Sequence, residues 1–478
     1  MQDYSDPDVI RVNDDYFMVA SSFNQIPGLP ILHSKNLVDW RLVNYVYDKL
    51  PSPYYDTVRH GDGSWAPSLR YHDGIYYCMI PMPDDGIYLS TTKDIFGKWS
   101  PLKLVIKKRG LEDPCPIWIG DKAYCAVGFA KSRAGFNSCI GLYEMKPDLS
   151  ENIGDYEIIY DGHDMNPTIE GPKFNERNGY YYIMAPAGSV KGGWQTALRS
   201  KSIHGPYEAK VVLFQGDTLV NGPHQGALID MGNDKWSFIH FQDMRAYGRI
   251  VHLEPVIWKN DWPLCGNVSD ELLCGTPVAE ADYPVDISFE GNMELSDSLD
   301  GSMSLHWQTP ANRNDSWYEF NNGLSLNCVN GIKPLNMQEN HFLLKVPALS
   351  FDVSVKVSLS LNDFDEAGIS MMGQKYRYLS ISRRDSNYYL SIKGGEFKSE
   401  DYLIHEELIQ GNSFELNIFA QNSNIYDLNY AFGINGKIIS DYFKASAGRW
   451  IGAKIGIFAR GNNGGRAVFK DFIVTSKN

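Results

Sequence analysis

The sequence predicts an all-β protein in which a five-bladed β-propeller is followed by an antiparallel β-sandwich. A turn of Asn, Asp or Gly and an aromatic-rich alternating run recur together five times in the first 265 residues, where helical periodicity is nearly absent. Short alternating runs dominate again from about residue 286 onward. The 478 residues also exceed the size at which one core keeps growing, so two domains are expected. We assign the propeller to residues 1–267, a linker to 268–285 and the sandwich to 286–478.

The recurring unit is predicted to be a β-hairpin, because Asn-Gly or Asp-Gly between apolar runs is the strongest local hairpin signal. Each hairpin is followed by a further strand that ends near an aromatic residue. Copies spaced by 47 to 60 residues suit the blades of a propeller. The five turns begin at Asn13, Asp73, Gly120, Asn178 and Asn233.

A proline lies six to ten residues ahead of each turn and marks the start of a strand. Proline is tolerated at the first residue of a strand, where no ladder N–H is required. The first strand of every propeller blade lines the central channel, so the five starts are expected to ring one mouth of that channel. They are Asp6-Pro7, Ala66-Pro67, Asp113-Pro114, Gly171-Pro172 and Gly222-Pro223.

Three acidic residues stand on this ring, at the position before the proline or one residue earlier: Asp6, Asp113 and Glu170. Carboxylates gathered in a concave site are costly unless each has its own charge state or task. The matching tasks are a general base, a general acid and a third carboxylate that tunes the acid, as in glycosidic cleavage. One acid beside a proline is more often a turn residue, but three at equivalent positions favour catalysis. The sequence leaves open whether the carboxylates are about 6.5–9.5 Å apart, for inversion, or about 5–5.5 Å apart, for retention.

Composition excludes several partners. The formal net charge is −14, and the one short basic cluster is Lys-Lys-Arg at 107–109, whereas a nucleic-acid partner needs a basic stripe. No apolar stretch is long enough to span a bilayer. The chain starts almost directly in a strand-like segment, so we expect an exported protein (periplasmic, surface or extracellular) whose signal has been removed, with a cytoplasmic location as the alternative.

The seven cysteines form no metal-like CxxC pair, and their odd number argues against a disulfide framework. We expect them to be small buried hydrophobic side chains. A pair between Cys265 and Cys274 is the alternative.

Six motifs of the first domain resemble glycoside hydrolase family 43, and the likeness covers the whole propeller. The motifs are "SDPDVIRVNDDYFMVASSF", "PGLPILHSKNLVDW", "WAPSLRYHDGIYY", "EDPCPIW", "TIEGPKF" and "YGRIVHLEP". The resemblance is greatest to the exo-acting β-xylosidase and α-L-arabinofuranosidase members of this inverting family, which acts on plant cell-wall pentose polymers. It implies that Asp6 is the general base, Asp113 the acid that modulates the pKa of its partner, and Glu170 the general acid.

The resemblance also implies a pocket for the terminal sugar. Phe23 and Trp65 would form its walls, Arg249 would hydrogen-bond the sugar hydroxyls, and His224 would lie near the channel centre, where it positions Asp6 or a buried water or ion. Burial in the blade core is the alternative for the two aromatic residues, and a satisfied polar role is the alternative for His224. No cofactor is expected for the chemistry.

The second domain shows regular short strands with turn signals, which indicate a β-sandwich. Its segments "DSLDGSMSLHWQ", "AGISMMGQ" and "AVFKDFIV" resemble the concanavalin-like jelly-roll domain of many family 43 exo-enzymes. This likeness implies a sandwich that packs against the propeller. It leaves open whether the sandwich also contributes a loop to the pocket or binds polysaccharide itself. The glycine-rich segment 461–466 has no following helix and is therefore no phosphate cradle, but it is a candidate loop for a structural Ca²⁺.

The predicted function is hydrolysis, with inversion, of terminal non-reducing α-L-arabinofuranosyl or β-D-xylosyl residues of hemicellulose. The segments "HGDGSWAPS" and "DPCPIW" resemble the arabinofuranosidase branch of the family, and this likeness favours arabinofuranosides. A β-D-xylosidase proper and a non-catalytic carbohydrate-binding propeller are the alternatives. The five-bladed fructan hydrolases are a third, but their Asn-Asp-Pro-Asn motif is replaced here by "SDPD" at 5–8. Asp8 has no acidic equivalent in the repeat, so we expect a supporting or surface role for it.

Overall fold

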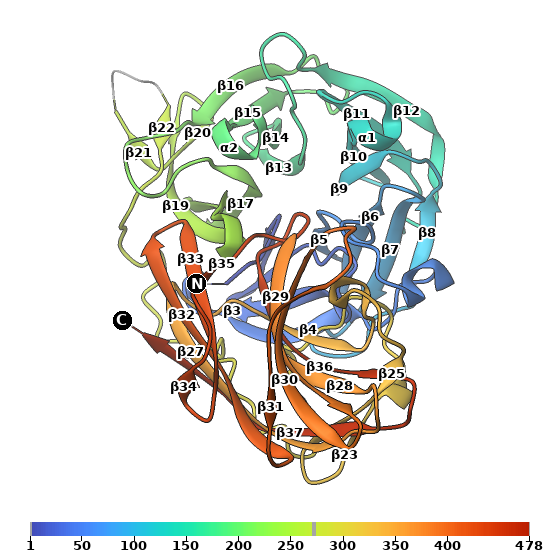
Figure 1. The fold of residues 1–478 in the computed structure, drawn as a ribbon. Coiled ribbons are helices and arrows are strands. Elements are labelled where there is room, and N and C mark those ends of the chain that lie inside the picture. Colours follow the sequence, from blue (N-terminus) through green and yellow to red (C-terminus); the bar gives the residue numbers. More distant parts are fainter. Residues whose placement is uncertain (1, 270–273, 478) are drawn as a thin grey trace.

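The computed structural model describes residues 2–269 and 274–477, and it contains a five-bladed β-propeller and a β-sandwich that lie side by side (Figure 1). The predicted fold class is confirmed. Within the described ranges, the helices are short turns of three or four residues, and none is long and apolar enough to cross a membrane. They are η1 (Pro53–Asp56), α1 (Lys131–Ala134), α2 (Ser189–Gly192), η2 (Arg245–Tyr247), η3 (Asp315–Trp317) and η4 (Leu335–Met337).

Each blade is an antiparallel sheet whose four strands follow one another in sequence, with the first strand innermost (Figure 1). Blade 1 consists of β1 (Asp8–Val12), β2 (Asp15–Val19), β3 (Gly28–Ser34) and β4 (Arg41–Tyr47). Blade 2 consists of β5 (Ser68–His72), β6 (Ile75–Met82), β7 (Gly86–Thr92) and β8 (Lys103–Ile106). Blade 3 consists of β9 (Leu111–Ile119), β10 (Lys122–Phe129), β11 (Cys139–Met145) and β12 (Asn152–Asp161). Blade 4 consists of β13 (Lys173–Arg177), β14 (Tyr180–Ala187), β15 (Trp194–Ser200) and β16 (Glu208–Leu213), and blade 5 of β17 (His224–Gly232), β18 (Lys235–Asp243), β19 (Arg249–Lys259) and β20 (Trp262–Cys265).

The predicted hairpins are present in all five blades, each with a two-residue loop between its first two strands. The first loop residue has a positive φ in every copy, which Asn, Asp and Gly tolerate better than other residues. The need for a positive φ at the first loop position therefore explains why these turn residues recur in the sequence. These residues are Asn13, Asp73, Gly120, Asn178 and Asn233.

The blades are held together by five buried hydrophobic clusters, one at each interface between neighbouring blades. The cluster between blades 5 and 1 closes the ring and includes Met18, Leu32 and Ile239. No strand is exchanged at this closure among the described residues; instead, Tyr4 donates its backbone N–H to Arg249 O over 3.0 Å.

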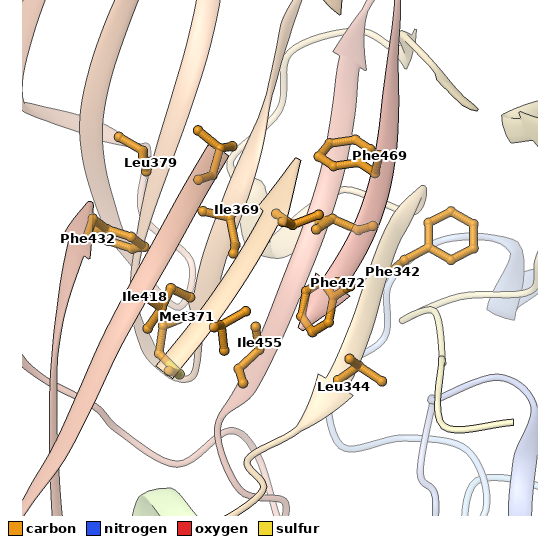
Figure 2. Close-up of a cluster of buried hydrophobic side chains, with 14 of the residues drawn as sticks. Phe342, Leu344, Ile369, Met371, Leu379, Ile418, Phe432, Ile455, Phe469 and Phe472 are labelled. Atoms are coloured by element: carbon orange, nitrogen blue, oxygen red, sulfur yellow. The ribbon is translucent and has the colours of Figure 1, made fainter. Parts of the chain in front are cut away.

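The sandwich consists of two mostly antiparallel sheets, one of eight strands and one of seven. The larger sheet contains β23 (Tyr318–Phe320), β24 (Leu324–Asn327), β27 (Ser350–Ser360), β32 (Ser413–Asn424), β33 (Asp427–Ile434), β34 (Lys437–Ile438), β35 (Phe443–Lys444) and β37 (Arg466–Lys477). The smaller sheet contains β25 (Val329–Asn330), β26 (His341–Lys345), β28 (Glu366–Met372), β29 (Lys375–Arg384), β30 (Asn387–Glu396), β31 (Tyr402–Ile409) and β36 (Lys454–Gly461). Alternate residues of both sheets point into a common apolar core (Figure 2).

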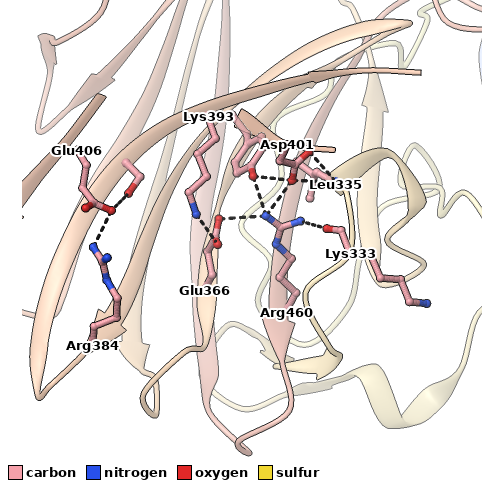
Figure 3. A network of polar contacts seen from close by, with 10 residues as sticks. Lys333, Leu335, Glu366, Arg384, Lys393, Asp401, Glu406 and Arg460 are labelled. Atoms are coloured by element: carbon pink, nitrogen blue, oxygen red, sulfur yellow. Dashed lines mark hydrogen bonds and ion pairs between the residues drawn. The ribbon is translucent and has the colours of Figure 1, made fainter. Parts of the chain in front are cut away.

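A buried ion network lies within the smaller sheet of the sandwich (Figure 3). The Arg460 guanidinium donates to the Tyr378 hydroxyl over 2.7 Å and contacts carboxylate oxygens of Glu366 and Asp401 at 3.3 Å each. Lys393 donates to the other Glu366 oxygen over 2.8 Å. Burial alone would raise the pKa of Glu366, but the two cations lower it to about 2, so this carboxylate stays ionised in the core.

The segment predicted as a linker joins the outer edge of blade 4 within its described part. β21 (Asn267–Val268) and β22 (Gly275–Thr276) pair with each other, and β22 pairs in parallel with β16. Further along the chain, Asp297 forms an isolated bridge with Phe472 of the sandwich. All seven cysteines are free, so the alternative of a Cys265–Cys274 disulfide is wrong.

The two domains share part of their core. The large cluster of the sandwich includes Met244, Tyr247 and Ile250, which belong to or flank the strands of blade 5. On the side of blade 1, Ile26 and Thr309 form an antiparallel bridge. The sandwich therefore packs closely against blades 1 and 5 of the propeller.

Candidate active site

A pocket of about 240 Å³ is formed where the strand starts of the five blades converge. The structure brings all seven predicted site residues to the wall of this one pocket. They are Asp6, Phe23, Trp65, Asp113, Glu170, His224 and Arg249. Ala66, one of the five predicted strand starts, also lines the pocket. Sequence reasoning missed several further wall residues, which are Glu112, Asn137, Thr168, Ser189, Val190, Gln225 and Trp450.

The backbone explains how the strand starts deliver side chains to the pocket. The residue before the proline has a left-handed conformation in four of the five blades: Asp6 (φ 54°), Asp113 (φ 53°), Gly171 (φ 57°) and Gly222 (φ 60°). Glycine adopts this conformation freely, whereas a non-glycine residue there is uncommon and typical of functional sites. The two aspartates therefore occupy positions that glycine would fill more easily.

Asp6 is buried, and both of its carboxylate oxygens accept hydrogen bonds. Arg249 Nη1 donates to Oδ1 over 3.0 Å, and Ser21 Oγ donates to Oδ2 over 2.5 Å. The guanidinium itself lies over the rings of Phe241 and Trp450, at 4.7 and 5.8 Å. These contacts fix the direction of the Asp6 carboxylate, as a general base requires.

Asp113 connects two neighbouring blades. Its Oδ2 accepts hydrogen bonds from the backbone N–H of Gly171 over 2.8 Å and from Gln225 Nε2 over 3.1 Å. Burial raises the pKa of Asp113 to about 6, although Lys173 and these two donors oppose the shift. Because Gly171 directly follows Glu170, Asp113 holds the backbone beside the predicted acid in place.

Glu170 has the environment of a general acid. Enclosure by the pocket wall raises its pKa, the negative charges of Asp113 and Asp6 raise it further, and it reaches about 8. Its side chain still keeps 33% of its surface open to the pocket. At neutral pH Glu170 therefore carries a proton that a bound substrate can reach.

His224 is the buried neighbour of this acid. Its Nε2 lies 3.4 Å from Glu170 Oε1, and burial together with the charge of Arg249 lowers its pKa to about 3. The imidazole is thus neutral, and its Nδ1 has no hydrogen-bond partner among the described residues. A neutral imidazole can orient the protonated carboxyl group without adding charge to the site.

Aromatic rings form one wall of the pocket. Phe23 and Trp65 meet edge-to-face with their centroids 6.5 Å apart, and Trp65 meets Trp450 in the same way at 6.4 Å. Trp65 is fixed by its indole N–H, which donates to Gly61 O over 2.9 Å. Both predicted aromatic residues therefore face the pocket instead of packing only in a blade core, and their rings suit an apolar sugar face.

Trp450 belongs to the sandwich, so the second domain completes the pocket. Its backbone carbonyl accepts a hydrogen bond from Ser5 Oγ over 3.3 Å. The Asp3 carboxylate accepts the N–H of Gly452 at Oδ2 and the N–H of Arg249 at Oδ1, both over 2.8 Å. No local signal in the sequence points to Trp450, because it meets the site across some 200 residues of chain and a domain boundary.

Two places outside the pocket offer groups that could bear on metal binding. In the 461–466 loop, the backbone N–H groups of Asn463 and Gly465 donate to Asp365 over 3.2 and 2.8 Å, so hydrogen bonds hold this loop. Outside the pocket, Cys139, Asp161 and His163 place one potential ligand atom each within 4.8 Å of the others. Neither place contacts the carboxylates of the pocket.

Family models match nearly the whole chain. The model of glycosyl hydrolases family 43 matches residues 1–263, and that of the β-xylosidase C-terminal concanavalin A-like domain matches residues 299–475. A putative β-xylosidase of Xylanibacter ruminicola is 35% identical over 461 residues, which are 95% of this chain and 84% of the relative. A non-reducing end α-L-arabinofuranosidase of Bacteroides ovatus is 28% identical over 286 residues, which are 55% of this chain and 51% of the relative.

Solved structures share the same two-domain fold. A bifunctional GH43-CE protein of Bacteroides eggerthii has a TM-score of 0.87 at 24% identity, and the match covers 100% of this chain and 63% of that one. A xylan β-1,4-xylosidase of Bacillus halodurans has a TM-score of 0.85 at 22% identity, with coverage of 99% and 98%. At these identities the likeness concerns the fold alone.

Proposed function

Because the chain belongs to glycoside hydrolase family 43, we propose that it removes terminal non-reducing pentose residues from hemicellulose side chains. The single observation that carries this proposal is the difference between the surroundings of the two pocket acids Asp6 and Glu170. Glu170 holds a proton at neutral pH, whereas Asp6 is held by a guanidinium and a hydroxyl in the same pocket. Two carboxyl groups in such different environments fit an acid and a base.

The proposed mechanism is a single displacement with inversion, as is general in this family. Asp6 takes a proton from the water that attacks the anomeric carbon, and Glu170 gives its proton to the leaving oxygen. Asp113 keeps Glu170 protonated and in position through Gly171. Enzymes of the family generally need no cofactor, and Asp6 and Glu170 supply both proton transfers that hydrolysis requires.

The size of the pocket supports exo action. A volume of about 240 Å³ lies below the roughly 300–1,000 Å³ of pockets for drug-sized ligands, which suits one terminal sugar unit. We place α-L-arabinofuranosides first, in line with the motifs around Trp65 and Asp113. A β-D-xylosidase is the second candidate, because the relative that aligns over 95% of this chain carries the name putative β-xylosidase.

The test uses an aryl α-L-arabinofuranoside and an aryl β-D-xyloside, with NMR detection of the anomer that is released first. We expect turnover of at least one substrate and an inverted first product. Tight oligosaccharide binding without turnover of either substrate would support the non-catalytic sugar-binding propeller instead. A first product of retained configuration would exclude the single displacement.

A further inference from the structure

Glu112 is a fourth acidic residue of the pocket, and the proposed mechanism gives it no task. It directly precedes Asp113 on β9, and 7% of its surface is exposed. It lines the pocket together with Asp6 and Glu170. Its side chain therefore reaches the space in which the terminal sugar would lie.

A β-bulge directs Glu112 toward the pocket. Successive residues of a regular strand point to opposite faces of the sheet, yet Glu112 and Asp113 line the same pocket. The register of β9 against β10 shifts beside Val127, which lies opposite both Asp113 and Pro114. At Gly128 a Cβ atom would come within 3.2 Å of Glu112 Cγ, so the glycine leaves room for the carboxyl-bearing chain. The local backbone is thus built to place two adjacent acids in one site.

The hydrogen-bonding capacity of Glu112 is not used by the protein. Asp6, Asp113 and Glu170 each have a protein partner within 3.4 Å of the carboxyl group. In the part of the chain that the structure describes, no residue donates a hydrogen bond to the carboxyl group of Glu112. The nearby cation of Arg133 is engaged by Asp62 and Asp84 at 3.0 and 3.2 Å. The carboxyl group of this pocket-lining residue is therefore left free to bind a ligand in the pocket.

The charge state of Glu112 decides which ligand it suits. Burial and the neighbouring carboxylates, Asp113 foremost, raise the pKa of Glu112 well above its ordinary value. A neutral carboxyl group offers one O–H donor and a carbonyl acceptor, whereas the ionised group only accepts. A sugar hydroxyl also donates and accepts, so it matches the neutral form at both atoms.

We propose that neutral Glu112 binds a hydroxyl group of the terminal sugar and is thereby a residue that selects the sugar. This inference rests on the proposed function of the pocket. Glu112 touches the substrate but takes no part in the proton transfers, which Asp6 and Glu170 carry out. Its contribution is therefore to substrate affinity and to discrimination between sugars that differ at that hydroxyl.

The decisive comparison is between Glu112→Gln and Glu112→Leu. Glutamine has the shape of the neutral acid and keeps one donor face and one acceptor, whereas leucine keeps only the volume. We expect Glu112→Gln to stay within about threefold of the native kcat/KM, and Glu112→Leu to lose roughly tenfold or more, mainly through KM. Glu176→Leu, at an exposed position of β13, is the matched control and should leave both constants unchanged.

Deoxy analogues of the better aryl glycoside locate the contact. Native enzyme should lose activity on each analogue, but Glu112→Leu should show no additional loss for the one analogue that lacks the contacted hydroxyl. If Glu112→Gln is as harmful as Glu112→Leu, the carboxyl group acts in its ionised form and the inference is wrong. It is also wrong if both variants leave KM unchanged but shift the alkaline limb of kcat/KM, since Glu112 would then only tune Glu170.

Sugar binding separates this inference from the proposed function. Calorimetric titration with L-arabinose and D-xylose measures recognition without turnover, so it remains informative even if no glycoside is hydrolysed. We expect the native protein and Glu112→Gln to bind one of these sugars with similar affinity, and Glu112→Leu to bind it roughly tenfold more weakly. Equal binding by all three proteins, or binding by none, would overturn the role of Glu112.

Discussion

The Oδ2 atom of Asp113 lies 2.8 Å from the backbone nitrogen of Gly171, the residue that follows Glu170. One carboxylate therefore both positions the chain that carries the proposed acid and raises the pKa of that acid by its charge. The two effects act on the same residue from a neighbouring blade, so the geometry of the propeller couples them. This coupling makes the pH dependence of the enzyme a direct test of the site.

The alkaline limb of kcat/KM should report Glu170. This acid must be protonated to act, so activity should be retained below its pKa of about 8 and fall as the pH rises through that value. In Asp113→Asn the like charge is lost but an acceptor for Gly171 N–H remains. We expect the limb to move down by about one pH unit. The limb is measured on an aryl glycoside with a poor leaving group, whose cleavage depends on the Glu170 proton. If it does not move in Asp113→Asn, the charge of Asp113 does not set the pKa of Glu170.

Substrates with different leaving groups should distinguish the acid from the base. Glu170→Gln removes the proton donor, so a poor leaving group should suffer a loss of about 10²–10⁴ while a nitrophenolate-type leaving group suffers far less. Asp6→Asn removes the group that activates water, so it should slow both classes equally. Steady-state rates on a series of aryl glycosides give both results. Equal losses in Glu170→Gln across the series would contradict its role as the acid.

Trp450 should be required for substrate binding although it belongs to the other domain. Removal of its ring in Trp450→Ala opens the pocket wall beside Trp65, and we expect KM to rise roughly tenfold. Trp450→Phe keeps an aromatic face and should stay within a few-fold of the native value. Tyr442→Ala, at an exposed aromatic residue of the same domain, should have no effect. Native KM in Trp450→Ala would show that the ring does not contact the sugar.

The Arg460–Glu366 pair should dominate the acid stability of the sandwich. The folded pKa of Glu366 is lowered to about 2, so its contribution is complete above the ordinary pKa of 4.5 and is lost as the pH falls from there toward 2. Glu366→Gln leaves a buried guanidinium short of a partner and should lower the free energy of unfolding by roughly 3–5 kcal/mol at neutral pH. It should also weaken the pH dependence between about pH 4.5 and 2.

Urea unfolding at several pH values measures both effects. Glu319→Gln is the control, because its ion pair with Arg466 is exposed on both sides and should contribute less than about 1 kcal/mol. A similar loss of stability in both variants would mean that burial does not strengthen the Glu366 pair.

The repeat made the fold and the three carboxylates of the pocket predictable from the sequence. Turn residues with positive φ and prolines at strand starts are local signals, so Asp6, Asp113 and Glu170 could be placed on one ring from the sequence alone.

Asp8 shows the limit of such signals. It is fully buried, and its Oδ2 accepts hydrogen bonds from Leu69 N and Arg70 Nη1 over 2.8 and 2.7 Å, so its role is supporting and the surface alternative is wrong.

Two pocket residues escaped sequence reasoning for different physical reasons. Strict strand alternation would point Glu112 away from Asp113. The bulge opposite Val127 that brings both into the pocket arises from the pairing of β9 with β10. Trp450 was missed because its place depends on how two domains dock, through hydrogen bonds such as that from Gly452 to Asp3. Local patterns carry neither kind of information.

The Asp3 carboxylate has a consequence for how such an enzyme can change over time. One of its oxygens accepts the backbone N–H of Arg249 in the propeller, and the other accepts the N–H of Gly452 in the sandwich. Asp3 therefore connects the residue whose guanidinium holds Asp6 to the loop that carries Trp450. A chimera that joins this propeller to an unrelated sandwich would lose both the wall of the pocket and the anchor beside its base. We therefore expect the two domains to be inherited together. Recombination that exchanged one of them alone would disrupt the proposed sugar site.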